Sequence, residues 1–194
     1  MQSLRKKVKS IVWGEDIYPT IEGYSKTTKL IIGALLGSLT VILQSAGIFA
    51  GLGYVLSMMS TGPLVVACLL SLKIGVMTYL VTSLLLVFIQ PTELLVFLFT
   101  TGLLGLSLGI GLTYFKKRMY VVLFAALCLT IGICTLLYGF KFAVLGSSVS
   151  VQINGKLILG TFLFSLLYSW IWQKISRSLI KILNKIPNSR RGEK

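Results

Sequence analysis

Apolar residues dominate the chain between residues 30 and 173, and short polar or glycine-containing breaks divide them into six runs. A helix that crosses a bilayer needs about 20 predominantly apolar residues, and each run approaches that length. The expected helices cover residues 30–48, 52–71, 74–90, 94–114, 119–138 and 157–173. The pattern therefore predicts an all-α integral membrane protein with six transmembrane helices.

Polar and small residues mark where these runs end. The clearest break is the stretch 90–93, where Pro91 and its polar neighbours interrupt the apolar pattern. Lys73 and the basic triplet 116–118 mark two further breaks. The first two runs are separated least clearly, because no charge occurs from Leu30 to Leu72 and only small residues near position 50 suggest a turn.

Both ends of the chain combine basic and apolar residues at helical spacing, which is typical of amphipathic helices on a membrane surface. In the C-terminal tail the basic positions Lys174, Arg177, Lys181 and Lys185 fall on one face. We therefore expect a cytoplasmic amphipathic segment at 1–29, a six-helix transmembrane domain at 30–173 and a basic amphipathic cytoplasmic tail at 174–194. The tail could rest on anionic membrane lipids, or it could bind a cytoplasmic partner protein.

Composition and charge strengthen the membrane assignment and add an orientation. Only 12% of the 194 residues are charged and the mean hydropathy is +0.89, whereas a soluble domain carries about 25% charged residues. With six spans, 17 of the 19 Lys and Arg residues fall on the side of the two termini, and only Lys141 and Lys156 fall on the other. The positive-inside bias then places both termini in the cytoplasm of a bacterial cell, with the chain in its cytoplasmic membrane. Because the positive charge flanks membrane segments, it does not indicate a nucleic-acid partner.

Several kinds of catalytic and metal chemistry lack the residues that they require. The chain has no histidine and five acidic residues, of which only Glu93 lies near a membrane segment. It has no phosphate-binding loop of the ATPase type and no dinucleotide-binding fingerprint. We therefore expect no catalytic residues, no metal site and no cofactor, and we do not expect an enzyme.

The remaining polar candidates belong to the predicted outer face. Gln90, Glu93, Lys141 and Asn154 are polar groups that could contact a small ligand in a pocket open to the exterior. The alternative is ordinary solvation of the outer loops, in which Glu93 and Lys141 form an exposed ion pair.

Small residues four apart recur on several predicted helices and allow another helix to approach closely. Gly33 and Gly37 form such a pair in the first helix, and Gly105 and Gly109 form one in the fourth. For the fourth helix, packing within the bundle is the expected role. For the first helix, docking of a partner helix and internal packing are both open.

The chain resembles the substrate-binding S component of an energy-coupling-factor (ECF) vitamin transporter. The resemblance covers residues 28–175 and rests on size, six spans and the orientation of the termini, together with short stretches of sequence. These stretches are 62–67, Gly75, Gln90 before a turn, and the glycine-rich segment 102–109. In that family the first helix carries small residues, commonly alanines, that dock on the membrane coupling subunit, and Gly33 and Gly37 stand at that place.

Two functions of different kinds follow from these features. The resemblance implies a membrane-embedded binding subunit for a small, vitamin-like solute, working with a coupling subunit and with ATPase subunits that supply the energy. The alternative is a non-catalytic structural or assembly subunit of a larger membrane complex, whose role would be contact between helices.

Overall fold

The computed structural model describes residues 24–49, 51–141 and 155–191. The burial and contacts of side chains are described as far as residue 180. All of the regular structure in these ranges is helical, and six of the helices or helix combinations are long and apolar enough to cross a membrane. The first two are α2 with η1 (Lys26–Ser45 and Ala46–Phe49), and α3 with α4 (Leu52–Met59 and Thr61–Leu70). The others are α5 (Leu72–Ile89), α6–η2–α7 (Pro91–Val96, Phe97–Thr101 and Gly102–Tyr114), α8 with η3 (Arg118–Cys134 and Thr135–Gly139), and α9 (Gly155–Arg191).

The helix ends differ from the predicted ones where local capping or packing decides them. The first helix begins four residues earlier than expected, at Lys26, because the Ser25 side chain caps it by accepting a hydrogen bond from the Thr28 amide at 3.1 Å. Lys73 was predicted to mark the turn between the second and third apolar runs, and this is wrong. It lies in the first helical turn of α5. The break falls at Ser71, whose backbone is extended (φ −173°, ψ 141°).

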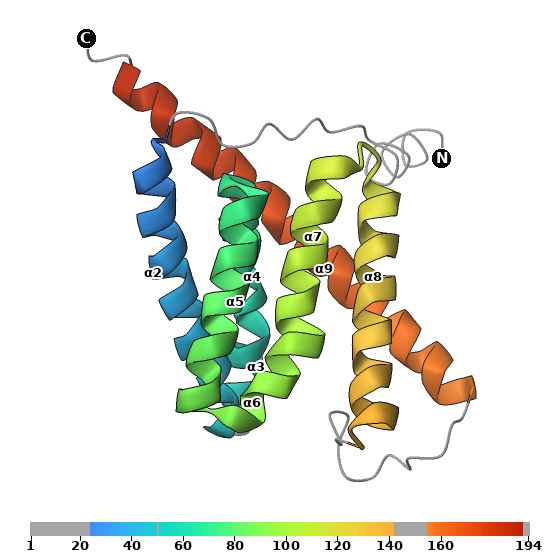
Figure 1. The fold of residues 1–194 in the computed structure, drawn as a ribbon. Coiled ribbons are helices and arrows are strands. Elements are labelled where there is room, and N and C mark those ends of the chain that lie inside the picture. The colour runs from blue at the N-terminus through green and yellow to red at the C-terminus, as the bar shows by residue number, and fades with distance from the viewer. Residues whose placement is uncertain (1–23, 50, 142–154, 192–194) are drawn as a thin grey trace, which may run out of the picture.

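The last helix continues past the predicted span into the basic tail, as the helical spacing of that tail indicated. α9 runs without interruption to Arg191, so residues 174–191 belong to the same helix as the sixth apolar run. Figure 1 shows α9 crossing obliquely behind the other helices, so that its two ends lie at opposite ends of the bundle. Most of the predicted N-terminal segment 1–29 lies outside the described residues.

Helix α4 lies at the centre of the bundle, between α5 and α7. Leu64 and Cys68 on α4 are almost fully buried and occupy the space that glycines on the neighbouring helices leave open. A Cβ atom added to Gly105 would lie 2.9 Å from Leu64 Cδ2, and one added to Gly109 would overlap Cys68. The small-residue pair of the fourth span therefore packs inside the bundle, as predicted.

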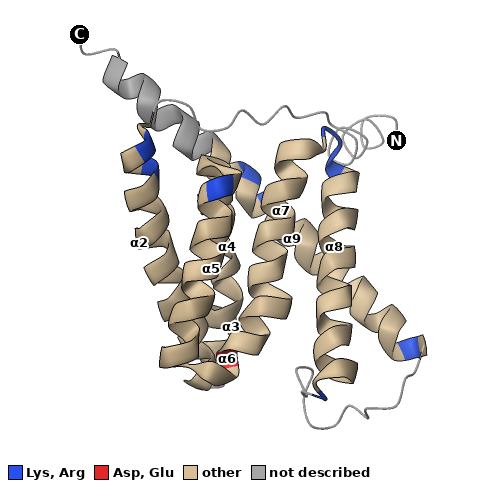
Figure 2. Ribbon diagram, viewed as in Figure 1, with Lys and Arg blue, Asp and Glu red and all other residues tan. Residues whose placement is uncertain are grey.

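The ends of the bundle differ in charge. Figure 2 shows most of the described Lys and Arg residues at the end where α2 begins and where α7 meets α8. Lys26 and Lys29 lie at the start of α2, and Lys73 lies at the start of α5. The triplet 116–118 lies where α7 meets α8, with Arg118 as the first residue of α8. We call this the basic end.

Candidate functional site

A cluster of polar side chains is buried at the opposite end of the bundle, where α2 ends and α6 begins. Gln44 on α2 has no exposed surface, although it lies within a segment long and apolar enough to cross a membrane. We define the Gln44 cluster as Gln44, Ser57, Ser60, Glu93 and Thr101, which come from α2, α3, the α3–α4 junction, α6 and η2. Because unpaired polar groups are costly in lipid, such a cluster requires mutual hydrogen bonds.

Every hydrogen-bonding position of the Gln44 amide is used. Its Nε2 donates to Ser57 Oγ and to Glu93 Oε2, both at 2.8 Å. Its Oε1 accepts from Ser60 Oγ at 2.8 Å and from Thr101 Oγ1 at 2.7 Å. One side chain therefore connects four segments of the chain, and the two donors and two acceptor bonds fix the orientation of the amide.

Glycines allow the backbone to close around this cluster. A Cβ atom added to Gly47 in η1 would overlap the Glu93 carboxylate, so the absence of a side chain there is what admits the carboxylate. A Cβ atom added to Gly53 would overlap the carbonyl oxygen of Ala46. Between them, Gly51 has a positive φ of 46°, a conformation that favours glycine. The turn from α2 to α3 thus brings Ser57 and Ser60 back over Gln44.

Glu93 is the member of the cluster that reaches the surface. Its carboxylate accepts from Gln44 on the buried side, while the residue as a whole is only partly buried. It is also the only acidic side chain within the described ranges, and no group of three potential metal ligands occurs there. The arrangement offers a negatively charged hydrogen-bond acceptor held in place by a buried amide, which suits binding of a ligand hydroxyl or amino group.

No family model, curated protein or solved structure matches this chain. Its function must be inferred from its own residues.

Of the four predicted ligand contacts, Glu93 alone belongs to the Gln44 cluster. The Gln90 side chain is partly buried and donates to Thr92 Oγ1 at 3.1 Å, two residues away. Lys141 is exposed and lies two residues after the end of η3, and Asn154 lies outside the described residues. Among the described residues, no hydrogen bond or ion pair links Lys141 to Glu93.

The four cluster members that are not among the predicted ligand contacts share a feature of the sequence. They are Gln44, Ser57, Ser60 and Thr101. Each is a polar residue inside a predicted apolar run, a placement that is expensive unless a partner is available. Serine and threonine are also frequent in ordinary membrane helices, however, because they can bond to the carbonyl four residues earlier, as Thr40 does to Leu36. A polar residue within an apolar run can therefore be recognised from the sequence, but the residues that it hydrogen-bonds to cannot.

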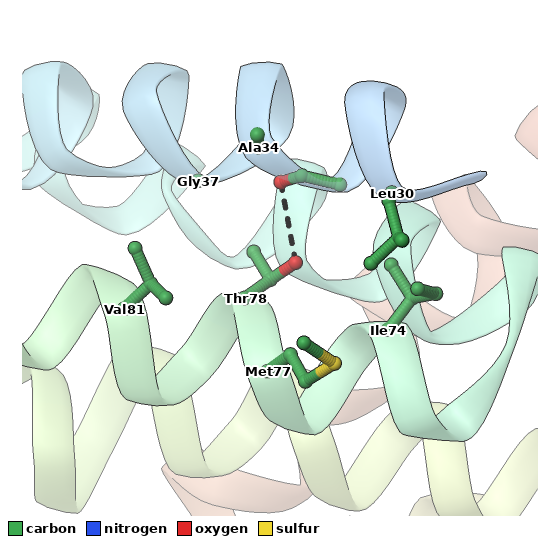
Figure 3. Close-up of a pocket in the computed structure, with 8 residues that line it drawn as sticks. Leu30, Ala34, Gly37, Ile74, Met77, Thr78 and Val81 are labelled. Carbon is green, nitrogen blue, oxygen red and sulfur yellow. Dashed lines mark hydrogen bonds between the residues drawn. The ribbon is translucent and has the colours of Figure 1, made fainter. Parts of the chain in front are cut away.

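The two glycines predicted to dock a partner helix are in contact with α5 of the same chain. Thr78 Oγ1 donates to the carbonyl oxygen of Gly33 at 3.2 Å, as Figure 3 shows, and Thr82 Oγ1 donates to that of Gly37 at 3.4 Å. A groove of about 140 Å³ lies along this contact, with Ala34 on its exposed side. Docking of a partner helix at Gly33 and Gly37 stays a prediction.

Proposed function

We propose that this chain is a membrane-embedded binding subunit for a small, vitamin-like solute in an ATPase-driven uptake complex. The observation that supports this best is the Gln44 cluster, which presents the partly exposed Glu93 carboxylate at the end of the bundle away from the basic end. If the basic end faces the cytoplasm of a bacterial cell, as the positive-inside bias favours, both termini are inside and Glu93 faces outward. A carboxylate in that position can meet a solute before it enters the cell.

The available side chains limit the chemistry of the solute. Glu93 would accept a hydrogen bond from a ligand hydroxyl or amino group, and Gln90, Lys141 and Asn154 remain the proposed further contacts. Few charged groups are available to pair with an ionic ligand, so the body of the ligand would be apolar or aromatic. In this proposal the chain binds its solute and does not change it chemically.

Uptake against a gradient then needs energy from other subunits. The sequence has no phosphate-binding loop, so ATP would be hydrolysed by separate ATPase subunits joined through a membrane coupling subunit. The groove beside Gly33 and Gly37 is the proposed docking place for that subunit. The binding subunit would deliver its solute inward by changing its orientation in the membrane.

A structural or assembly subunit remains the second candidate, and one observation favours it. All hydrogen-bonding positions of Gln44 are satisfied within the chain, so the cluster can be explained as a device that joins four helical segments. The two candidates differ in what they bind, because only the first requires a solute and ATPase subunits.

Purification of the tagged full chain from its native membrane in mild detergent tests the proposal. We expect a second membrane protein and at least one protein with an ATP-binding motif to co-purify in fixed ratio. Gly37→Leu would disturb the contact with Thr82 as well as any partner, so Ala34→Leu on the exposed side of the groove is the sharper variant. It should abolish co-purification without loss of folded protein, whereas Leu35→Phe, at a position that is 66% exposed and outside the groove, should not. Recovery of membrane proteins without any ATPase would favour the structural role instead.

A further inference from the structure

The groove between α2 and α5 opens toward the surroundings of the bundle and not toward its interior. Three of the side chains along it, Leu30, Met77 and Val81, are each 47–51% exposed. The floor carries one hydroxyl, that of Thr78, and this hydroxyl already donates to the carbonyl of Gly33 at 3.2 Å. Figure 3 shows these walls, with Leu30 and Ile74 facing each other at one end. The groove therefore offers an occupant an almost entirely apolar surface.

The rows of residues that form the α2 wall both begin with a lysine. Residues four apart lie above one another on a helix. One row runs from Lys26 through Leu30 to Ala34, and the other from Lys29 through Gly33 to Gly37. Following either row from the groove toward the basic end leads directly to an ammonium group.

The α5 wall has the same construction. Its exposed row runs from Lys73 through Met77 to Val81, and Lys73 is itself exposed. Three lysines on two helices thus stand at one mouth of an apolar groove. The only acidic residue in the described ranges, Glu93, belongs to the Gln44 cluster at the other end of the bundle.

The length of the groove fits one leaflet. From residue 30 to residue 37 a helix rises about 10 Å, whereas one leaflet of a hydrocarbon core about 30 Å thick measures about 15 Å. The groove begins at the first apolar turn of α2, so it ends well before the bilayer centre. The groove therefore covers about two thirds of the depth that an acyl chain of one leaflet spans.

We propose that this groove is a binding site for an anionic phospholipid, with one acyl chain between α2 and α5 and the phosphate held by Lys26, Lys29 and Lys73. The combination is what makes the site selective. Any lipid can place a chain against an apolar groove, but only a headgroup with net negative charge gains from three lysines at its mouth. Solute binding near Glu93 is not needed for this inference. At the groove itself, however, the lipid and the proposed coupling subunit would compete, because one groove cannot hold both.

Native mass spectrometry of the full purified chain tests the site. The delipidated protein is titrated with phosphatidylglycerol or with phosphatidylcholine of identical acyl chains, and the first binding constant of each is measured. Since a lysine near the membrane surface contributes roughly fivefold to anionic-lipid affinity, we expect phosphatidylglycerol to bind at least about tenfold more tightly. Lys26→Gln/Lys73→Gln should remove most of that preference, because it takes away one lysine from each wall.

Two matched controls separate a built site from general attraction. Lys116→Gln/Lys156→Gln removes the same charge elsewhere and should change the preference by no more than about twofold. Ala34→Phe, which fills the groove, should weaken phosphatidylglycerol binding, while Leu35→Phe should leave it unchanged. Equal binding of the two lipids would overturn the proposal. A preference for phosphatidylglycerol that Ala34→Phe leaves unchanged would also overturn it, because it would indicate only general attraction to a charged surface. A groove occupied by a second copy of the chain would overturn it as well.

Discussion

Replacement of Gln44 by leucine should destabilise the protein strongly, although the two side chains have similar volumes. The change removes four hydrogen bonds that join α2 to α3, the α3–α4 junction, α6 and η2. Hydrogen bonds between membrane helices contribute about 0.6 kcal/mol on average, so four of them give about 2.4 kcal/mol. The hydroxyls can recover part of this by turning to backbone carbonyls, and Glu93 can turn to water. We therefore expect the free energy of unfolding to fall by about 2 kcal/mol.

Reversible unfolding of the purified protein in mixed detergent micelles measures this loss. Gln90→Leu is the matched control, because the Gln90 side chain is only partly buried and bonds only to the exposed Thr92 two residues away. It should change stability by less than about 0.5 kcal/mol. A double-mutant cycle of Gln44→Leu with Thr101→Val should give a coupling energy near 0.6 kcal/mol. Equal stability of Gln44→Leu and Gln90→Leu would refute the central place given to the Gln44 amide.

Two further predictions concern packing and topology. Gly109→Ala should lower the free energy of unfolding by about 1–3 kcal/mol through overlap with Cys68. The control Gly160→Ala should be neutral or stabilising by up to about 1 kcal/mol, since nothing lies within 4 Å of its added Cβ. If the two variants lost equal free energy of unfolding in the same assay, the packing of α4 against α7 would be contradicted. The topology is tested in intact cells with a variant whose three native cysteines are replaced. In that variant Ser148→Cys should react with a membrane-impermeant maleimide and Ser189→Cys should not. Labelling of Ser189→Cys would show that the C-terminus faces outward.

The sequence was sufficient for the number of helical segments long and apolar enough to cross a membrane, but not for where each one bends or stops. Apolar runs of about 20 residues specify spans because lipid excludes other backbone arrangements. Within a continuous apolar stretch, however, hydropathy gives little indication of where a helix breaks. The second span divides at Ser60, and the turn after it falls at Ser71 and not at Lys73. Those breaks depend on backbone conformation and packing that the composition does not encode.

The candidate site was predictable only in part, because its residues come from helices that are far apart in the sequence. Glu93 was found because it is the one carboxylate near a membrane segment. Its partner Gln44 lies 49 residues away, and their meeting depends on the close turn that Gly47 and Gly53 permit. In the same way, the three lysines at the mouth of the groove can be grouped only once α2 and α5, which are separated by α3 and α4, are known to pack together. Pairing of distant helices is tertiary information, and one sequence does not supply it.

The most direct test of the proposed solute-binding role is a search for the solute itself. The full chain is purified gently from its native membrane, denatured, and the released small molecules are identified by mass spectrometry. We expect one compound, enriched to about one molecule per chain over an unrelated membrane protein purified in parallel. It should rebind to the native protein and at least about tenfold more weakly to Glu93→Gln, because a charge-assisted hydrogen bond contributes roughly 1.5–3 kcal/mol. Absence of any enriched compound, or rebinding that Glu93→Gln leaves unchanged, would contradict the account.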